Sequence, residues 1–600
     1  MSINSALGTA VTGLAVNQRG LEIASHNIGN ANTEGYSRKI AHRESISSSG
    51  TAGGVQIAKI ERAAETFITN QLRTEVASFG RSEVKDRFLT NTQNMFGTLA
   101  SDSSIGQRLA DLTARMETLA VEPESSTGAN AMVDAAVLFA RDLNNISDEI
   151  VRLRRQADLE IENAVDAINA DLEIVAKLNE QIASLQGKNA DSGDLEDRRD
   201  QALKRIATEI NIKTFQRSSG EIVIYTGDSR PLLDGDPIPL QYESSSNGIL
   251  GTTYDDLTLA DGAVIQRDIR DGRIRGLLDV RDQVLPNLHK QIDAFAENVR
   301  DMANLAHNRG MGLPGANALT GGRVFENPAT DLITVSSDVR FVVTDDEGMT
   351  VAAFDLPAGS YTIDGVAAAI DAGLGADGSA VVANGQLRLT AAASDNAVGL
   401  VDLNGGADAQ ISFDDGSGAE AFAGFSNFFG LNDLFQTPGA VEGDDPTNIA
   451  GALQVRADIV DDPKLLARGR VTLAATTPVA GADRAIAVGD GSVVGELAAI
   501  FSADRAMPAV GGLPAITKPI HEYAAEILGL NSQLAADSAE RLAFEEALVA
   551  QFQTRLSDRT AVNVDEELAN ILILQNAFSA SARVITTADE MMQTLMQMKR

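Results

Sequence analysis

The sequence lacks cysteine and tryptophan, and only 4% of its 600 residues are aromatic. Without cysteine there is no disulfide framework, no thiolate metal site and no thiol nucleophile. We find no hydrophobic run that reads as a membrane span, and the first residues lack the basic region and apolar block of a secretory signal. These absences predict a cytosolic chain, unless a dedicated export route reads a different signal.

The formal net charge of −35 argues against a nucleic acid partner, because the phosphates would be repelled. Acidic residues strongly outnumber basic ones between Asn327 and Lys518, whereas the two ends are closer to neutral. This charge distribution suits a chain that associates through its ends, although acidic middles are also common in soluble surface proteins. The length predicts about three to four domains.

The two ends of the chain carry matching helical patterns. Apolar or small residues alternate at spacings of four and three, with one polar slot near each end: Ile3, Leu7, Ala10, Leu14, Asn17, Leu21, Ala24 and Ile28, then Val564, Leu568, Ile571, Gln575, Phe578, Ala582, Ile585 and, a heptad later, Met592. A stripe of this spacing forms a narrow seam and predicts a partner helix. The alternative is that both helices only complete the core of a monomer.

The first helix is predicted to be weak. Gly8, Gly13 and Gly20 each cost it about 1 kcal/mol relative to alanine. The final helix has a stronger start, since Asn563 and Glu566 form a capping box. We expect both ends to be mobile in the free monomer and to become ordered on assembly.

Between the ends, the pattern alternates between helical and β-rich segments. The sequence predicts a turn at Asn32–Tyr36, a loop at Ser45–Gly54, helices from about 64 to 119, a long helix at Ala131–Leu185, a helix at Asp194–Ile210, strands at 212–215 and 222–225, a helix at Leu277–His307, β-rich structure at 327–514, and helix at 520–600 with a break near 557–563. The long helix would be a rod of roughly 80 Å.

The expected fold is α+β and multidomain: terminal helices paired in a coiled-coil-like core, a long helical-rod second domain and β-rich inserted outer domains. The predicted divisions are 1–44 with 557–600 as a terminal assembly domain, 45–211 with 271–326 and 515–556 as the helical rod, 212–270 as a small β unit, and 327–514 as the insert. Nested insertion of this kind would place the two termini together and the β domains outward.

Motifs for chemistry are few, and we predict no enzyme, no cofactor and no metal site. Gly373–Gly378 matches a dinucleotide fingerprint in letters, but it follows a helix and precedes a strand, which is the reverse of the required order. Asp402, Asp408, Asp414 and Asp415 lack the spacing of a calcium loop and are interpreted as solvated turns. The charged residues from Asp194 to Lys204 are interpreted as a helix face rather than an acid–base site.

Both ends resemble one known family. Asn27–Tyr36, read as Asn-Ile-Gly-Asn-Ala-Asn-Thr-Glu-Gly-Tyr, resembles the Asn-Ile-Ala-Asn-x-Asn-Thr-x-Gly-Tyr signature of bacterial flagellar rod, hook and hook-associated proteins, with Gly29 where alanine is usual. Residues 562–591 resemble the family's C-terminal motif, with Phe578 where tyrosine is common. Three further features are most similar to the hook-associated members of the family. They are the Ser37-Arg38 ending of the signature, the long helix followed by residues 195–200, and residues 276–310.

The resemblance implies a structural protein at the hook–filament junction of the flagellum, located outside the cell and only transiently cytoplasmic. It implies a homo-oligomeric ring with hook protein on one side and a second junction protein and the filament on the other, reached through the type III export apparatus, without membrane insertion. Predicted self-association residues are those of the two stripes, namely Ile3, Leu7, Leu14, Asn17, Leu21, Ile28, Leu568, Ile571, Gln575, Phe578, Ile585 and Met592, with Asn30, Asn32, Thr33, Gly35 and Tyr36 of the signature.

A cytosolic export chaperone is expected to cover Leu568, Ile571, Leu572, Phe578 and Ile585 before export. Two alternative functions remain open. A hook or distal rod protein would share the terminal motifs but is not expected to carry the long helical second domain. A flagellar subunit with an enzymatic insert would need convergent polar groups in a cleft of the insert.

Overall fold

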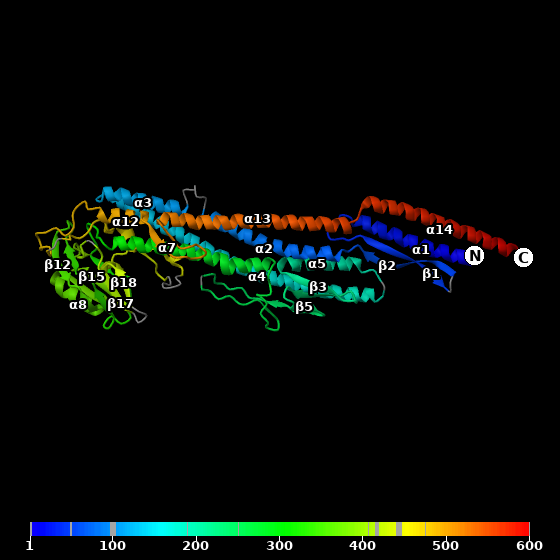
Figure 1. Cartoon of the computed structure of the whole chain (residues 1–600), viewed down its shortest axis with the longest axis horizontal. Helices are drawn as coiled ribbons and strands as arrows, with labels where there is room; N and C mark the ends of the chain where they lie inside the picture. Colours follow the sequence, from blue (N-terminus) through cyan, green and yellow to red (C-terminus); the bar gives the residue numbers. More distant parts are fainter. Residues whose placement is uncertain are drawn as a thin grey trace.

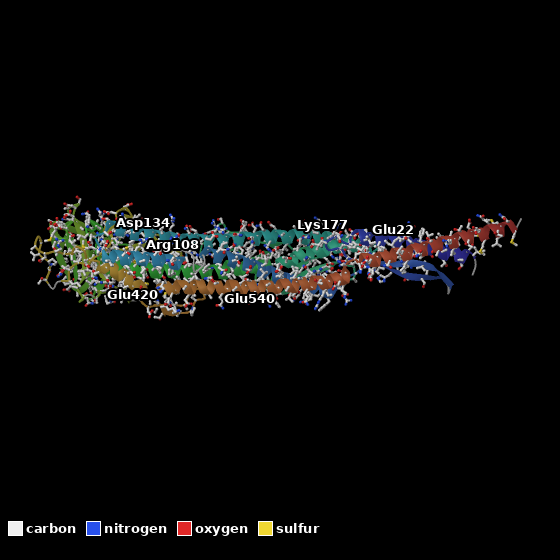
Figure 2. All side chains as sticks on the ribbon, turned by 90° about the horizontal axis from the view of Figure 1, so that it is seen from above. Glu22, Arg108, Asp134, Lys177, Glu420 and Glu540 are labelled. Carbon is white, nitrogen blue, oxygen red and sulfur yellow. The ribbon has the colours of Figure 1, made fainter. Side chains whose placement is uncertain are left out.

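The computed structural model describes residues 3–48, 51–96, 104–188, 190–249, 251–405, 407–414, 419–439, 447–473 and 476–598. The chain forms a long rod with both termini at one end and a β-rich region at the other (Figure 1). In the perpendicular view Glu22 lies toward the end with the termini and Glu420 toward the opposite end (Figure 2). The expected α+β class and the shared position of the termini are confirmed.

Four elements form the end that holds the termini. They are the helices α1 (Ile3–Gly29) and α14 (Val564–Met598), and the antiparallel strands β1 (Lys39–Ser48) and β2 (Thr51–Arg62). The β1–β2 ribbon packs along α1, where the backbone N–H of Val55 donates to the Thr12 hydroxyl at 3.3 Å. Because an isolated two-stranded ribbon is marginal in water, this packing on α1 stabilises it.

The ribbon corrects the sequence-based prediction of a loop at Ser45–Gly54. Strands β1 and β2 run through most of that segment, and its residues 49 and 50 lie outside the described part of the chain. Serine and glycine have low strand propensity, so the local sequence resembles a loop. The contact with α1, which single-sequence patterns do not reveal, decides in favour of strands.

The rod consists of long helices packed side by side. Its helices are α2 (Thr66–Phe96), α3 (Ile105–Val121), α4 (Ser126–Gln186), α5 (Gly193–Glu209), α6 (Arg273–Asp279), α7 (Leu285–His307), α12 (Ser492–Ser502) and α13 (Ile520–Thr560), with a π-helical turn η1 (Val280–Val284) between α6 and α7. Helix α4 has 61 residues and is therefore roughly 90 Å long. Its apolar stripe is buried at nearly every position from Val133 to Ile182, with Val137 half-buried.

A small β unit packs on the side of α4 through buried Ile224 and Leu233. It contains the sheet β3-β4-β5-β6 and the pair β7-β8, with bounds β3 (Ile212–Gln216), β4 (Ile222–Thr226), β5 (Pro231–Asp234), β6 (Asp236–Pro237), β7 (Leu240–Gln241) and β8 (Thr258–Leu259). The predicted strands at 212–215 and 222–225 are confirmed as the antiparallel pair β3–β4.

The insert has a separate hydrophobic core, which includes buried Phe341, Phe425 and Phe429. Three sheets surround it, with strand orders β13-β10-β17-β18, β12-β11-β16 and β14-β15-β9. The elements are β9 (Ala318–Thr320), β10 (Leu332–Val335), β11 (Val339–Thr344), β12 (Thr350–Leu356), β13 (Gly359–Thr362), α8 (Ile363–Leu374), η2 (Gly375–Asp377), β14 (Gly378–Ala383), β15 (Gln386–Ala391), β16 (Ala397–Asp402), β17 (Gln410–Asp414), β18 (Ala419–Ala423) and α9 (Phe425–Phe429).

The chain that returns from the insert packs with the rod. Leu434, Ile459, Val494 and Phe501 are all buried in the core of the long helices rather than in that of the insert. The segment contains short elements: β19 (Phe435–Gln436), α10 (Ile449–Ala452), β20 (Gln454–Val455), α11 (Ala457–Asp461), η3 (Pro463–Leu465), β21 (Arg505–Met507) and β22 (Ile516–Lys518). The sequence-based division at 514 placed this segment with the insert because it is acidic and rich in glycine, and that division stays a prediction.

A buried histidine ties α7 to the returning chain. His307 Nε2 accepts the N–H of Ala467 at 2.9 Å, so Nδ1 carries the proton and donates to the Asn432 carbonyl at 2.6 Å. Burial, together with the Arg456 charge, lowers the pKa of His307 from 6.5 to about 3. The imidazole therefore remains neutral in the folded protein across the physiological range.

We expect the stability contributed by His307 to be lost in acid. Below about pH 6.5 the unfolded chain takes up a proton that the folded chain does not bind, so the native state is disfavoured as the pH falls. The advantage of the native protein over His307→Gln should shrink by about 2 kcal/mol between pH 7 and pH 5. Urea unfolding of both proteins at each pH measures this difference in stability. The comparison isolates His307, because all other titratable groups are the same in the two proteins. Parallel stability curves would contradict the neutral-histidine account.

Candidate assembly site at the paired ends

Helices α1 and α14 lie antiparallel along each other at the end of the rod (Figure 1). A Cβ placed on Gly20 would lie 3.1 Å from Leu574 Cδ2, and a Cβ on Gly13 would lie 3.5 Å from Ser581 Oγ. Gly20 thus allows α1 and α14 to approach closely, and Gly13 also lies in their contact. By contrast, no atom lies within 4 Å of a Cβ built on Gly8.

The residues predicted for the α1 seam lie on the face toward α14 and the ribbon. Asn17 is buried, as are Ala10 and Ala24. The others are half-buried: Ile3, Leu7, Leu14, Leu21 and Ile28. Sequence reasoning missed Val16, Gly20 and Ile23, which are also buried. With these residues, the buried face of α1 is wider than the predicted seam. The reason is that α1 packs against two neighbours, α14 and the ribbon, whereas the predicted seam assumed a single partner helix.

On α14 the structure brings only part of the predicted seam against α1. Ile571, Phe578, Ile585 and Met592 are half-buried, whereas Leu568, Leu572 and Gln575 are exposed. The other inward positions are Glu567, Leu574, Ser581 and Ala588, each at seven-residue spacing. Sequence reasoning missed these four positions for two reasons. Two of the four residues are polar, and the rows of α14 on either side of them carry apolar residues. The facing Gly13 and Gly20 are the signal that could have located them.

The outward surface of α14, called the outer stripe below, is apolar, and no described part of the chain covers it. Its exposed residues are Val564, Leu568, Leu572, Ile573, Val584, Met591, Leu595, Met596 and Met598. By length and composition alone, one helical stretch within Ile520–Met598 is apolar enough to cross a membrane, which corrects the sequence-based statement that no such run exists. Little of that stretch is buried in the chain. A large exposed apolar stripe marks a contact surface.

The signature turn connects α1 to the ribbon through side-chain hydrogen bonds. Buried Asn27 accepts from the Tyr36 hydroxyl at 2.7 Å and from Lys39 N–H at 3.0 Å, and donates to the Lys39 carbonyl at 3.0 Å. Burial, followed by the charges of Asp194 and Asp197, raises the pKa of Tyr36 above its ordinary value, so the hydroxyl remains a donor.

The remaining signature residues shape the turn itself. Asn30 donates to the His26 carbonyl at 2.9 Å, and the Thr33 hydroxyl donates to Asn30 Oδ1 at 3.3 Å. Gly35 has φ +77°, a backbone conformation that favours glycine, and a Cβ there would displace the end of the Gln201 side chain. Asn32 is exposed.

Ion pairs join this turn to the rod. Arg38 reaches Glu567 at 2.7 Å and Glu566 at 2.9 Å, while its N–H donates to the Thr560 carbonyl at 2.8 Å. Arg38 therefore connects the turn to both α13 and α14. The helix break between α13 and α14 lies within the region predicted from the sequence, near 557–563. At the inward position of α14 Arg38 also compensates the buried charge of Glu567.

The N-terminal part of α5 supplies the opposing carboxylates. Lys39 pairs with Asp191 and Asp194, each at 2.9 Å. Burial lowers the pKa of Lys39, but its hydrogen bonds to these two carboxylates outweigh burial and raise it overall. Arg62 pairs with Glu196 and Asp197, each at 2.9 Å, and with Asp200 at 2.5 Å. The charged segment from Asp194 is thus part of a structural ion-pair network.

One buried group in the described part of the chain combines residue types that can act in catalysis. Ser147, His289 and Asp293 lie together, with the Ser147 hydroxyl 3.0 Å from His289 Nε2. Asp293 approaches the same nitrogen at 3.9 Å rather than Nδ1, and all three are buried, so a relay with access to substrate is not formed. Gly373–Gly378 runs from α8 into β14, in the helix-before-strand order expected from the sequence.

Two of the aspartates considered for calcium bind groups of the protein itself. Asp402 accepts the backbone N–H groups of Ala409 and Phe425, and Asp408 pairs with Arg309 at 2.6 Å. Asp415 lies outside the described residues. Within the described ranges, no group of three or more histidine, aspartate or glutamate side chains is arranged to hold a metal.

The antiparallel register of α1 and α14 predicts which two introduced cysteines will form a disulfide. The chain itself has no cysteine that could compete. In Gly13→Cys with Ser581→Cys, the new Cβ at position 13 lies 3.5 Å from the position of Ser581 Oγ, which a cysteine sulfur would take, so mild oxidation of the dilute protein should link the two within one chain. Gel mobility without reductant measures the link. The control Gly8→Cys with Ser581→Cys should remain open, because Gly8 has no neighbour within 4 Å. Equal linking in both variants would contradict the register.

Fold and site together define a class: an elongated structural subunit whose two chain ends form one helical unit with an unpaired apolar stripe. Three family models match the chain. Residues 89–325 match the helical domain of flagellar hook-associated protein FlgK, 558–598 match the C-terminal region of flagellar basal body rod FlgEFG proteins, and 7–36 match flagella basal body rod protein.

Flagellar hook-associated protein 1 of Escherichia coli is 21% identical over the full length of both chains. The Bacillus subtilis protein of the same name is 25% identical, over 36% of this chain and 44% of that relative. A solved structure, the flagellar hook junction protein FlgK from Burkholderia pseudomallei, aligns at 15% identity and a TM-score of 0.45, covering 81% of this chain and 99% of that one. Over residues 89–325 the chain thus matches the FlgK helical domain, and over its full length it is similar to flagellar hook-associated protein 1.

Proposed function

We propose that the chain is the structural subunit of the junction between the flagellar hook and filament, and that it assembles through α1 and α14. The observation that carries the proposal is the outer stripe of α14, which exposes nine large apolar residues beside an intact α1–α14 pair. A monomer gains nothing from this exposure, whereas repeated copies would bury it.

The site residues divide into two groups under this proposal. Ile571, Phe578, Ile585 and Met592, together with the α1 seam, hold the two helices in a coiled-coil-like pair. Leu568, Leu572 and Gln575 face outward and contact neighbouring copies in a ring. The predicted mobility of both ends in the free monomer stays a prediction. Protection of residues 3–30 from hydrogen exchange in the monomer would contradict it.

The same proposal divides the chain by role. Residues 1–44 with 557–600 form the assembly unit. The long helices with the returning chain form the rod, and the small β unit and the insert are attached to the rod. Type III export, a cytosolic chaperone on the apolar residues of α14, and contacts with hook protein, a second junction protein and the filament belong to the proposal. An unpaired stripe such as Leu568, Leu572 and Ile573 would self-associate in the cytosol, which gives a chaperone its physical reason.

Deletion of the gene tests the proposal. Electron microscopy should show finished hooks without filaments, and filament monomers should accumulate in the medium. Absent hooks would favour the alternative of a hook or distal rod protein, and normal filaments would overturn the proposal. Restoring the intact gene should restore filaments, which controls for effects on neighbouring genes.

A further inference from the structure

The last two turns of α14 are rich in methionine. Four of the 12 methionines of the chain lie there: Met591, Met592, Met596 and Met598. Met591, Met596 and Met598 are 52%, 69% and 80% exposed. The methionines in the cores are buried instead, namely Met116, Met132, Met302, Met311 and Met507.

The antiparallel register explains this exposure. Gly13 lies opposite Ser581 and Gly20 opposite Leu574, and the same spacing continued places Ile3 beside Met591. Beyond that point α14 extends past the described part of α1 (Figure 1). The surface there is a shallow open groove lined by Thr587, Glu590, Met591, Thr594 and Leu595. Met591, Met596 and Met598 are therefore left uncovered by the described part of the chain, whereas Met592 is half-buried.

Methionine is also the only sulfur in this protein, because the sequence has no cysteine to react first. A peroxide oxidises a thioether in one step: the sulfur lone pair attacks one peroxide oxygen, the O–O bond breaks, an S–O bond forms, and the other oxygen leaves as water after protonation. Sulfur loses two electrons and the peroxide gains them. The rate depends on access to the sulfur, which the exposed segment provides.

We propose that Met591, Met592, Met596 and Met598 form a sulfoxidation site for peroxide-class oxidants, and that their oxidation prevents a second copy of the chain from covering this part of α14. The second part rests on the proposed function. Val584, Met591, Leu595 and Met598 recur at helical spacing and form one exposed apolar row near the end of α14. A sulfoxide is polar, so burying it in this apolar contact is unfavourable.

Mass spectrometry of the full-length chain during treatment with hydrogen peroxide tests the site itself. The peptide between Arg583 and Lys599 contains all four methionines, and the buried Met116 and Met132 are internal references. The four should oxidise about tenfold faster than the references or more. Equal rates would overturn the site, whatever the function of the protein.

Incorporation of peroxide-treated chains into flagella of the deletion strain tests the consequence. Treated native protein should lose at least about tenfold in incorporation, and methionine sulfoxide reductase should restore it. The variant with Met591→Leu, Met592→Leu, Met596→Leu and Met598→Leu should incorporate to the same extent with and without peroxide treatment. The control with Met95→Leu and Met349→Leu, which are half-buried elsewhere, should remain sensitive.

If the methionine segment is oxidised selectively but the treated native protein is still fully incorporated into flagella, the proposed effect of oxidation on assembly is overturned. If untreated native protein were not incorporated at all, the proposed function would fail, while the selectivity measured by mass spectrometry would still stand as a result on its own.

Discussion

Leu568→Asp should abolish incorporation into the flagellum while leaving the free protein folded. Leu568 is 49% exposed on the outer stripe, so a carboxylate there remains hydrated in the monomer. In an assembly that covers the stripe, the same carboxylate would be buried without a partner, at a cost of several kcal/mol per copy. Motility and filament counts in the deletion strain carrying the variant measure the loss, which repeated copies would make essentially complete.

Two further variants sharpen this test. Leu159→Asp changes a leucine that is 52% exposed on α4, so it controls for adding a carboxylate to an exposed helix position, and it should assemble normally. Ile571→Asp places the charge on the half-buried face toward α1 and should therefore disturb the α1–α14 pair as well as assembly. Normal filaments carrying Leu568→Asp would refute the role of the outer stripe.

Arg281→Met should destabilise the rod by about 3–5 kcal/mol, because it strands a buried charge. Arg281 projects from the π-helical turn η1 and pairs with the fully buried Asp158 of α4 at 2.8 Å. Its guanidinium also lies 4.2 Å from the ring centre of Tyr254 and contacts Tyr242. Burial lowers the pKa of Arg281, but the paired Asp282, Tyr242 and Asp158 outweigh it and raise the pKa overall.

The midpoint of urea unfolding of the rod, followed by circular dichroism, measures the effect. Arg87→Met is the matched control, since Arg87 pairs with Glu160 at a partly exposed site and its loss should cost about 1 kcal/mol or less. The double variant Arg281→Met with Asp158→Asn should recover part of the loss, because it removes the stranded charge. Equal effects of Arg281→Met and Arg87→Met would contradict the buried-pair account.

Periodicity predicted the rod well because each long helix buries one stripe. The stripe of α4 is buried nearly throughout, and the caps and breaks of α13 and α14 lie close to where Asn563 and its neighbours indicated. Local patterns carry this information directly. The signature turn was also predictable, because Gly35 requires a positive φ and Tyr36 must find a partner, which is Asn27.

The parts that sequence did not predict depend on contacts distant along the chain. The ribbon from Lys39 to Arg62 exists because α1 supports it, and the returning chain near Val494 belongs to the rod because its apolar residues face α3 and α7. On α14, two adjacent apolar stripes compete, and Gly13 and Gly20 of α1 decide which one faces inward. The assembly role of the outer stripe stays a prediction.

Thiol labelling of Leu568→Cys tests the central claim most directly. This variant carries the only thiol of the chain, so a maleimide reports on one position. The free protein should label readily, and the same residue in purified hooks with filaments should be protected. Val264→Cys, exposed on the small β unit, should label in both states. Equal labelling of Leu568→Cys before and after assembly would contradict the claim that the outer stripe of α14 is buried between copies.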